Sequence, residues 1–243
     1  MAASEWMGGA ERGESAQVVS IARDMEEKVS AARRFLEDRL YGVTDACVTS
    51  SFQASGVVVL DLVTRVVPEI PVLFLDTGYH FQETLDYRDR MAERLGLKLI
   101  NVVPERTVAE QEALFGILNQ TEPDRCCAMR KVEPLFRALE GYRVWVTGLR
   151  RQQSKSRTNL QHEESFVLPT GRKLEKLNPL AGWTEREVWQ YAETRDLPLL
   201  PLYEQGYASI GCAPCTSLPL YPDDPRSGRW GGQKLECGIH VQP

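Results

Sequence analysis

The chain has 243 residues, of which 42% are hydrophobic and 26% are charged, and its formal net charge is −5 at pH 7. This composition is typical of a globular protein, and the negative charge disfavours a broad basic face for duplex nucleic acid. No apolar run approaches the roughly 18–20 residues that a membrane span requires, and residues 1–17 resemble neither a secretory signal nor a transit peptide. We therefore expect a cytoplasmic protein that binds neither nucleic acid nor a membrane.

The first predicted elements follow a leader over residues 1–17, which is rich in Gly, Glu and Ser and which we expect to be disordered. Apolar residues at steps of three and four from Ile21 to Leu40 then predict an amphipathic helix. Beyond it, β-rich runs alternate with helical stretches. The predicted strands cover 46–49, 71–75, 97–103 and 143–147, and the predicted helices cover 57–67, 81–95, 107–118 and 128–139. This alternation predicts an α/β fold, with a mostly parallel twisted sheet and helices on both of its faces.

The last third of the chain has fewer regular signals. Thr184 and Glu187 have the spacing of a capping box, which predicts a helix that runs to about Arg195. Beyond Pro198 the sequence is rich in Pro and Gly. We therefore expect one α/β domain over residues 18–218 and a mobile C-terminal tail over residues 219–243.

Ligands of such sheets bind where the strands end, so the loops after the predicted strands are candidates for a binding site. Three of these loops stand out, at residues 50–56, 76–78 and 147–154. The first, Ser-Ser-Phe-Gln-Ala-Ser-Gly, offers small and hydroxyl residues at the start of a helix, which suits an anion. It matches neither the P-loop nor the dinucleotide-binding fingerprint.

Four of the six cysteines form two pairs, Cys126 with Cys127 and Cys212 with Cys215. Disulfides are not expected in a reducing compartment, whereas two thiol pairs can supply the four soft ligands of a [4Fe–4S] cluster or of zinc. Adjacent thiols on a helix diverge by about 100°, which favours the cluster. Zinc and a redox-active dithiol at Cys212 and Cys215 remain alternatives. Cys47 lies in an apolar strand and is predicted to be an inert core residue.

Basic charge gathers in one part of the chain. The segment from Arg125 to Lys173 holds eleven Lys or Arg and four Glu, a local charge of +7, so the rest of the chain sums to −12. Arginine forks bind phosphate and sulfate oxygens, so this segment and the tail arginines predict a small substrate with two or three negative charges. The candidate cations are Lys131, Arg150, Arg151, Lys155, Arg157, Arg226 and Arg229. A solvated surface charge is the alternative for each.

Cys237 has no cysteine near it in the sequence. A single thiol beside arginines and His240 can have a lowered pKa and can act as a nucleophile. An idle, exposed cysteine is the alternative.

Together these motifs resemble those of the assimilatory adenylylsulfate and phosphoadenylylsulfate reductases. The resemblance covers roughly residues 46–240. It rests on Leu-Asp-Thr-Gly at 75–78, Cys-Cys-x-x-Arg-Lys at 126–131, Thr-Gly-x-Arg-Arg-x-Gln-Ser at 147–154, Asn-Pro-Leu at 178–180 with Trp183, Gly-Tyr-x-Ser-Ile-Gly-Cys-x-Pro-Cys-Thr at 206–216 and Glu-Cys-Gly-x-His at 236–240. It implies the fold of the adenine-nucleotide α-hydrolase (ATP-pyrophosphatase-like) group. Because both cysteine pairs are present, it also implies the iron–sulfur branch, whose members typically use adenylylsulfate.

The implied activity is the thioredoxin-dependent reduction of adenylylsulfate to sulfite and AMP, in sulfate assimilation and cysteine biosynthesis. The implied catalytic residues are Cys237, which would carry an S-sulfocysteine intermediate, and Lys131, Arg157, Arg226, Arg229 and His240. The implied substrate-binding residues are Ser50, Ser51, Leu75, Asp76, Thr77, Gly78, Gly148, Arg150 and Arg151. The implied ligands of the [4Fe–4S] cluster are Cys126, Cys127, Cys212 and Cys215. The implied partner is thioredoxin or a related dithiol carrier, and a homo-oligomer is left open.

The chain departs from the family pattern at Ser55 and Gly56, where the family commonly has Glu-Asp. Three alternatives stay open. The first is a phosphoadenylylsulfate reductase or an enzyme that accepts both nucleotides. The second is a zinc-binding regulatory module. The third is an ATP-dependent amide-forming or sulfur-inserting enzyme of the same broad fold, although residues 50–56 lack the Ser-Gly-Gly-x-Asp-Ser loop that such an enzyme needs.

Overall fold

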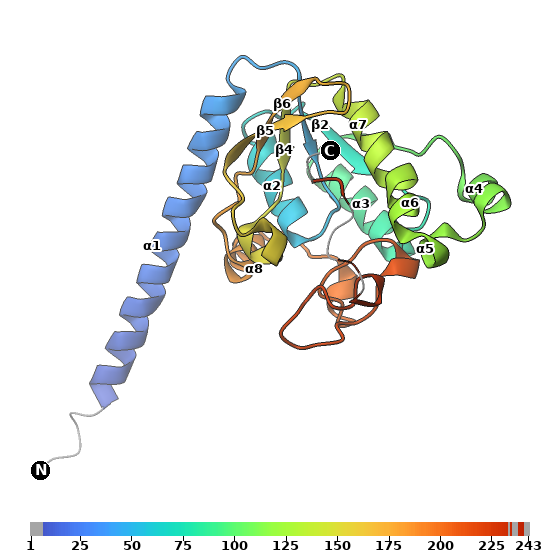
Figure 1. Cartoon of the computed structure of the whole chain (residues 1–243). Coiled ribbons are helices and arrows are strands. Elements are labelled where there is room, and N and C mark those ends of the chain that lie inside the picture. The colour runs from blue at the N-terminus through green and yellow to red at the C-terminus, as the bar shows by residue number, and fades with distance from the viewer. Residues whose placement is uncertain (1–6, 233, 235–237, 241–243) are drawn as a thin grey trace, which may run out of the picture.

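The computed structural model describes residues 7–232, 234 and 238–240, with side chains from Arg23 onward. A six-stranded sheet with the order β3-β2-β1-β4-β6-β5 forms its centre (Figure 1). The strands are β1 (Ala46–Thr49), β2 (Pro71–Leu75), β3 (Lys98–Val102), β4 (Val144–Thr147), β5 (Glu163–Val167) and β6 (Lys173–Leu177). All pairs are parallel except β5 with β6. The prediction of a mostly parallel sheet is confirmed.

The helices lie between and around these strands. They are α1 (Met7–Leu40), α2 (Ala54–Thr64), α3 (Gln82–Arg94), α4 (Val108–Phe115), α5 (Leu118–Thr121), α6 (Pro123–Cys127), α7 (Glu133–Leu139) and α8 (Glu185–Thr194). Helix α1 begins well before the apolar pattern at Ile21, so residues 7–17, expected within a disordered leader, continue the helix. Its first half extends away from the rest of the molecule (Figure 1).

Helices cover both faces of the sheet, as expected, because successive side chains of a strand point to opposite faces. Val48 and Val146 face one side, where they pack in a buried cluster with side chains of α1, α2, α3 and α8. Their neighbours Cys47 and Trp145 face the other side and pack with side chains of α7. The Cys47 side chain is fully buried, and burial raises the pKa of its thiol, in agreement with an inert core role.

Strands β5 and β6 are not predicted from the sequence. Their residues include several Glu and Lys, which are common in exposed elements and rare in buried strands. Strand β5 is the edge of the sheet, where one side of the strand faces solvent, so charged residues are tolerated there. The carboxyl ends of β1, β2 and β4 lie side by side in the sheet, which brings the loops that follow them together.

After α8 the chain continues with short 3-10 turns, which are η4 (Pro201–Tyr203), η5 (Ala213–Cys215) and η6 (Trp230–Gly232). The end of the domain pairs with the tail: Thr216 forms a β-bridge with Arg229, and the Ser217 N–H donates to the Gly228 carbonyl. Arg229 and Trp230 are buried, so the described start of the tail packs onto the domain. The mobility of residues 219–243 remains a prediction. Among the described residues, no helix combines the length and the apolar character needed to cross a membrane.

Glu187 joins α8 to α1. Its carboxylate accepts the Thr184 N–H at 2.8 Å, which completes the predicted capping box, and it accepts the Lys28 ammonium of α1 at 2.6 Å. Burial alone raises the pKa of Glu187, but Lys28 and Thr184 outweigh it, so the pKa lies below its usual range. The folded state therefore favours the ionised carboxylate.

We expect Glu187→Gln to lower the free energy of unfolding at pH 7 by about 1 kcal/mol, since it removes the charge that both partners favour. This stabilisation is present above the ordinary carboxyl pKa and is lost as the pH falls through the lowered folded-state value. The gap in thermal midpoint between the wild type and the variant should therefore narrow in acid. Glu27→Gln, in an exposed ion pair of α1, should change the midpoint little at either pH, whereas a gap for Glu187→Gln that is independent of pH would contradict the account.

Candidate functional site

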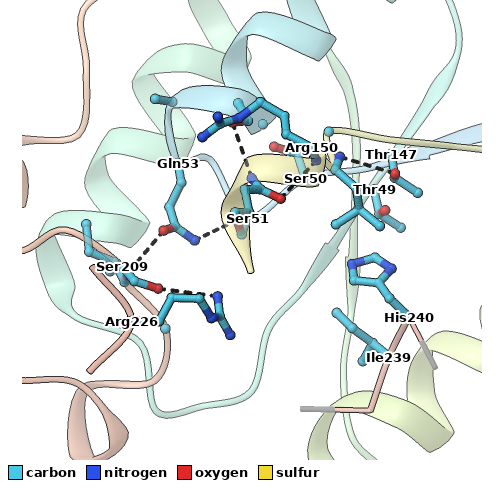
Figure 2. Close-up of a pocket in the computed structure, with 18 of the residues that line it drawn as sticks. Thr49, Ser50, Ser51, Gln53, Thr147, Arg150, Ser209, Arg226, Ile239 and His240 are labelled. Carbon is cyan, nitrogen blue, oxygen red and sulfur yellow. Dashed lines mark hydrogen bonds between the residues drawn. The ribbon is translucent and has the colours of Figure 1, made fainter. Parts of the chain in front are cut away.

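A cavity of about 260 Å³ lies at the carboxyl ends of β1, β2 and β4. Its walls come from the loops after these strands, from the first residues of α2 and from the tail (Figure 2). Eleven of the predicted site residues line it: Ser50, Ser51, Leu75, Thr77, Lys131, Gly148, Arg150, Arg157, Arg226, Arg229 and His240. The structure thus brings together side chains that are far apart in the sequence.

The loop after β1 makes a sharp turn, and the N-terminus of α2 then lies at the cavity. Phe52 adopts a positive φ of 57°, and its N–H donates to the Ser50 Oγ at 3.0 Å, which closes the turn. Helix α2 has no side-chain N-cap bond, and its first residues, Ala54 and Ser55, line the cavity. A helix N-terminus that opens into a cavity attracts anions, because its first N–H groups have no partner within the helix.

Close packing of the backbone holds this loop against the end of β4. A Cβ on residue 148 would lie 2.8 Å from the Ser55 carbonyl oxygen, so only Gly148 allows this approach. Gln53 connects the loop to the C-terminal part of the chain. Its amide donates to the Ser51 Oγ at 3.1 Å, and its oxygen accepts the Ile210 N–H at 2.9 Å (Figure 2).

Several cations of the cavity contact neutral polar side chains. The Nε of Arg150 donates to the Ser55 Oγ at 2.8 Å, and burial lowers the pKa of this guanidinium. The Nη1 of Arg157 donates to the Gln153 Oε1 at 2.6 Å. Arg226 lies near Ser209, with 3.5 Å between Nη1 and Oγ (Figure 2). Among the described residues that line the cavity, four arginines and Lys131 stand against one acidic residue, Glu185, so the cavity suits an anionic ligand.

The end of the described chain enters the same cavity. Ile239 and His240 line it (Figure 2). The His240 ring stacks on Trp145 with 5.4 Å between centroids and 18° between planes. Burial lowers the pKa of His240 well below its usual value, with Arg157, Lys176 and Arg226 acting in the same direction. The imidazole is therefore neutral at pH 7 and can act as a hydrogen-bonding group. Cys237, the predicted nucleophile, lies outside the described residues.

Three predicted substrate-binding residues do not line the cavity. The Asp76 carboxylate accepts the Gly78 N–H at 3.0 Å, so it shapes the loop after β2. Gly78 has a φ of +72°, and a Cβ there would press on Val108. The Nε of Arg151 donates to the Leu160 carbonyl at 2.7 Å, away from the cavity. These residues support the site through the backbone.

Other lining residues have no role in the sequence analysis. They include Gln53, Gln153, Trp189, Tyr203 and Ser209. The Tyr203 oxygen accepts the Ala54 N–H at 3.1 Å, and burial raises the pKa of this phenol to about 12. Ser209 belongs to the Gly-Tyr-x-Ser-Ile-Gly motif, which could have indicated it; Tyr203 and Trp189 belong to no recognised motif.

A second, smaller cavity adjoins the first. All four paired cysteines line it, Cys126 and Cys127 at the end of α6, Cys212 just before η5 and Cys215 within it. The other lining residues are Tyr79, Asn119, Pro123, Arg130, Lys131 and Trp230. The loop after β2 holds the second pair in place: the Thr77 Oγ1 lies 3.2 Å from the Cys212 Sγ, and the Ala213 N–H donates to the Tyr79 carbonyl. The expected convergence of the two cysteine pairs is therefore present.

The donor set of this cavity fits an iron–sulfur cluster. Four thiols converge, and the indole Nε1 of Trp230 is buried at the cavity without a partner among the described residues, as a donor to a bound group would be. Burial and then Cys212 raise the pKa of Cys215 to about 11, so a bound cation is needed to keep these thiols ionised. Among the described residues, no group of three or more His, Cys, Asp or Glu side chains, the four thiols included, is arranged to hold a metal ion.

Lys131 lies on the wall that the two cavities share. The chain after Cys127 forms one turn of π-helix, Ala128–Val132, a feature that is frequent at functional sites. Lys131 lines both cavities. Burial raises the pKa of Cys215, and the charge of Lys131 opposes this shift. Burial lowers the pKa of His80, and the charge of Lys131 adds to this shift. One ammonium thus acts on both the cysteine cavity and the larger cavity.

Comparisons with known proteins agree with this arrangement. The phosphoadenosine phosphosulfate reductase domain matches residues 45–218. Adenosine 5′-phosphosulfate reductases from Mycobacterium tuberculosis and Rhodococcus opacus are 48% and 45% identical, covering 80% and 82% of this chain and 76% and 80% of their own. A crystal structure of phosphoadenylyl-sulfate reductase from Candida auris aligns with a TM-score of 0.66 at 26% identity, over 75% of this chain and 88% of that one.

These matches support the fold of the adenine-nucleotide α-hydrolase group for the six-stranded sheet. The matched region contains β1 to β6 and both cysteine pairs. The chain belongs to the phosphoadenosine phosphosulfate reductase family of enzymes.

Proposed function

We propose that this enzyme reduces adenylylsulfate to sulfite and AMP, with Cys237 as nucleophile and a dithiol protein such as thioredoxin as reductant. The observation that carries the proposal is the pair of adjoining cavities that share Lys131. One holds cations and a helix N-terminus, and the other holds four cysteines. The adenosine 5′-phosphosulfate reductases among its relatives support this substrate.

The nucleotide is placed by the chemistry of the cavity walls. We assign its phosphate to the start of α2, near Ser50 and Ser51, and its sulfonyl group to the cations Lys131, Arg226 and Arg229. The adenosine would then rest along Leu75 and Gly148. In this orientation the sulfur atom would lie among Lys131, Arg226 and Arg229, in the cavity that Ile239 and His240 also line.

The chemistry then needs two thiol steps. The Cys237 thiolate attacks the sulfur of adenylylsulfate, the S–O bond to AMP breaks, and the SO₃ group stays on Cys237 as S-sulfocysteine. A thiolate of the carrier then attacks the Cys237 sulfur and releases sulfite, which takes away the electron pair of the S–S bond. The second carrier thiol resolves the mixed disulfide. The dithiol thus supplies the two electrons that sulfate needs to become sulfite.

The cations act when charge shifts onto the sulfonyl oxygens and onto the leaving phosphate. Arg229 is buried and lies with its Cζ 4.5 Å above the centre of the Trp230 ring, so its guanidinium is fixed before the substrate arrives. The neutral His240 can donate one hydrogen bond without adding charge. Closing of the tail would exclude water, and opening would present Cys237 to the carrier.

Cys126, Cys127, Cys212 and Cys215 would hold a [4Fe–4S] cluster. When bound, the cluster supplies a fixed local field and an anchor between α6 and η5, without a change of oxidation state. Lys131 lines both cavities and would connect the cluster site with the substrate site. A cytoplasmic location, where thiols stay reduced, fits both the cysteines and the carrier.

The 3′-phosphorylated nucleotide is kept as an alternative substrate, because Ser55 and Gly56 replace the acidic pair that is common in the family. Both line the cavity beside the buried guanidinium of Arg150, so no carboxylate at these two positions opposes a further phosphate. Parallel assays with the two nucleotides decide between them.

The first prediction concerns the reaction itself. Anaerobically purified enzyme with adenylylsulfate and reduced thioredoxin should release one sulfite for each AMP. Without thioredoxin, mass spectrometry should find an added SO₃ on the wild type and none on Cys237→Ser, which should still bind AMP. A sulfonated Cys237→Ser protein would disprove the nucleophile, and the absence of sulfite with either nucleotide would disprove the function.

The cysteine ligands predict a matched pair of variants. Cys215→Ala should lose the visible absorbance of the cluster and most of the bound iron, because a thiolate ligand is gone. Cys47→Ala, at a buried cysteine that packs in the core on the other side of β1 from α2, should keep both. Equal iron content in the two variants would rule out the proposed ligand set.

Lys131 and Lys155 provide a second matched pair. Lys131→Met should lower kcat about 100- to 1000-fold, the usual cost of losing one electrostatic donor to a transition state. AMP has no sulfonyl group, so its Kd should change little. Lys155 is exposed and lies outside the cavity lining, and Lys155→Met should leave kcat unchanged. Similar rates for the two variants would remove Lys131 from the mechanism.

A further inference from the structure

Gln111 is a polar side chain with no role in the mechanism, although it is completely buried beside the cysteine cavity. It lies in α4, and 0% of it is exposed. Its amide oxygen accepts the Arg130 Nη1 at 3.1 Å, and Arg130 itself lines the cysteine cavity. Its amide nitrogen Nε2 is buried with no hydrogen-bond partner among the described residues. A buried amide nitrogen without an acceptor costs about 1–3 kcal/mol, so its retention needs an explanation.

Arg130 fixes the orientation of this amide. A guanidinium has only donors, so it can meet only the oxygen end of Gln111. The Arg130 side chain is itself held by backbone, since its Nε donates to the Thr77 carbonyl at 2.5 Å and its Nη1 lies 3.3 Å from the Arg106 carbonyl. The NH₂ end of Gln111 must therefore point away from Arg130.

The thiol next to this pair of side chains is that of Cys126. Cys126 lies in the last turn of α6, four residues before Arg130 in the π-helical turn that follows, so the two side chains are one helical turn apart. Cys126 and Arg130 line the same cavity. Gln111 does not line it but accepts a hydrogen bond from the Arg130 guanidinium. Amide N–H groups commonly donate to the cysteine sulfurs of iron–sulfur clusters, and such bonds set the reduction potential.

We propose that Gln111 is a positioning residue for the iron–sulfur cluster: Arg130 holds its amide oxygen, and its amide nitrogen donates to the Cys126 sulfur. This inference rests on the proposed function, because it needs the cluster. The bond would satisfy the buried nitrogen and would orient Cys126. It would also draw electron density from the sulfur, which favours the more reduced cluster.

Gln111→Glu tests the proposal because it keeps the shape of the side chain. The carboxylate introduced at position 111 can still accept from Arg130, and it gains an ion pair, so the fold is retained. It has no N–H to give to Cys126, and it adds negative charge. The cluster of this variant should therefore have a more negative midpoint potential and should lose iron to a chelator about 10-fold faster than the wild type.

Gln120→Glu is the matched control, since Gln120 is exposed on the neighbouring helix α5 and undergoes the same change of charge. Its potential and its iron release should equal those of the wild type. A midpoint potential and an iron release equal to those of the wild type in Gln111→Glu, with an intact wild-type spectrum, would overturn this inference alone. A wild-type protein that binds no iron after anaerobic reconstitution would overturn the cofactor as well.

Discussion

The buried guanidinium of Arg130 organises the site, because it ties three segments of the chain together without a carboxylate partner. It donates to the Thr77 carbonyl in the loop after β2, to carbonyls before α4 and to Gln111 within α4. The same loop then holds the second cysteine pair through the contact of Thr77 with Cys212. A charged donor bound to several carbonyls stabilises the ends of segments that secondary structure alone would leave apart. The neighbouring Lys131 owes its place between the two cavities to this framework.

The two cavities differ in the charge of the groups that line them. Four arginines and Lys131 line the larger cavity, so it gathers positive charge although the whole chain is negative. In the cysteine cavity, burial and neighbouring thiols raise the pKa of Cys215, so that cavity favours a cationic group. Under the proposed function, the first cavity binds the anionic nucleotide and the second the cluster, and the charge of Lys131 bears on both. His240 adds shape and a hydrogen bond but no charge at neutral pH.

The sequence predicts those features that depend on periodicity or on a complete motif. Alternation places Cys47 and Val48 on opposite faces of the sheet, and the paired cysteines converge as expected. The sequence does not predict that the Arg150 side chain lines the cavity while the Arg151 side chain points away from it. The two side chains differ because a 3-10 turn begins at Arg151. Nor does the sequence reveal Gln111, whose role depends on where α4 packs, or the π-helical turn after Cys127. These are tertiary effects that local propensity does not encode.

The central claim is that the nucleotide cavity and the cysteine cavity act as one site through Lys131. The most direct measurement is the Mössbauer spectrum of the ⁵⁷Fe-labelled enzyme, recorded without ligand, with AMP and with adenylylsulfate. The account predicts that adenylylsulfate, whose sulfonyl group contacts Lys131, changes the iron parameters, and that AMP changes them less. A spectrum that stays the same when the site is saturated with adenylylsulfate would contradict the coupling.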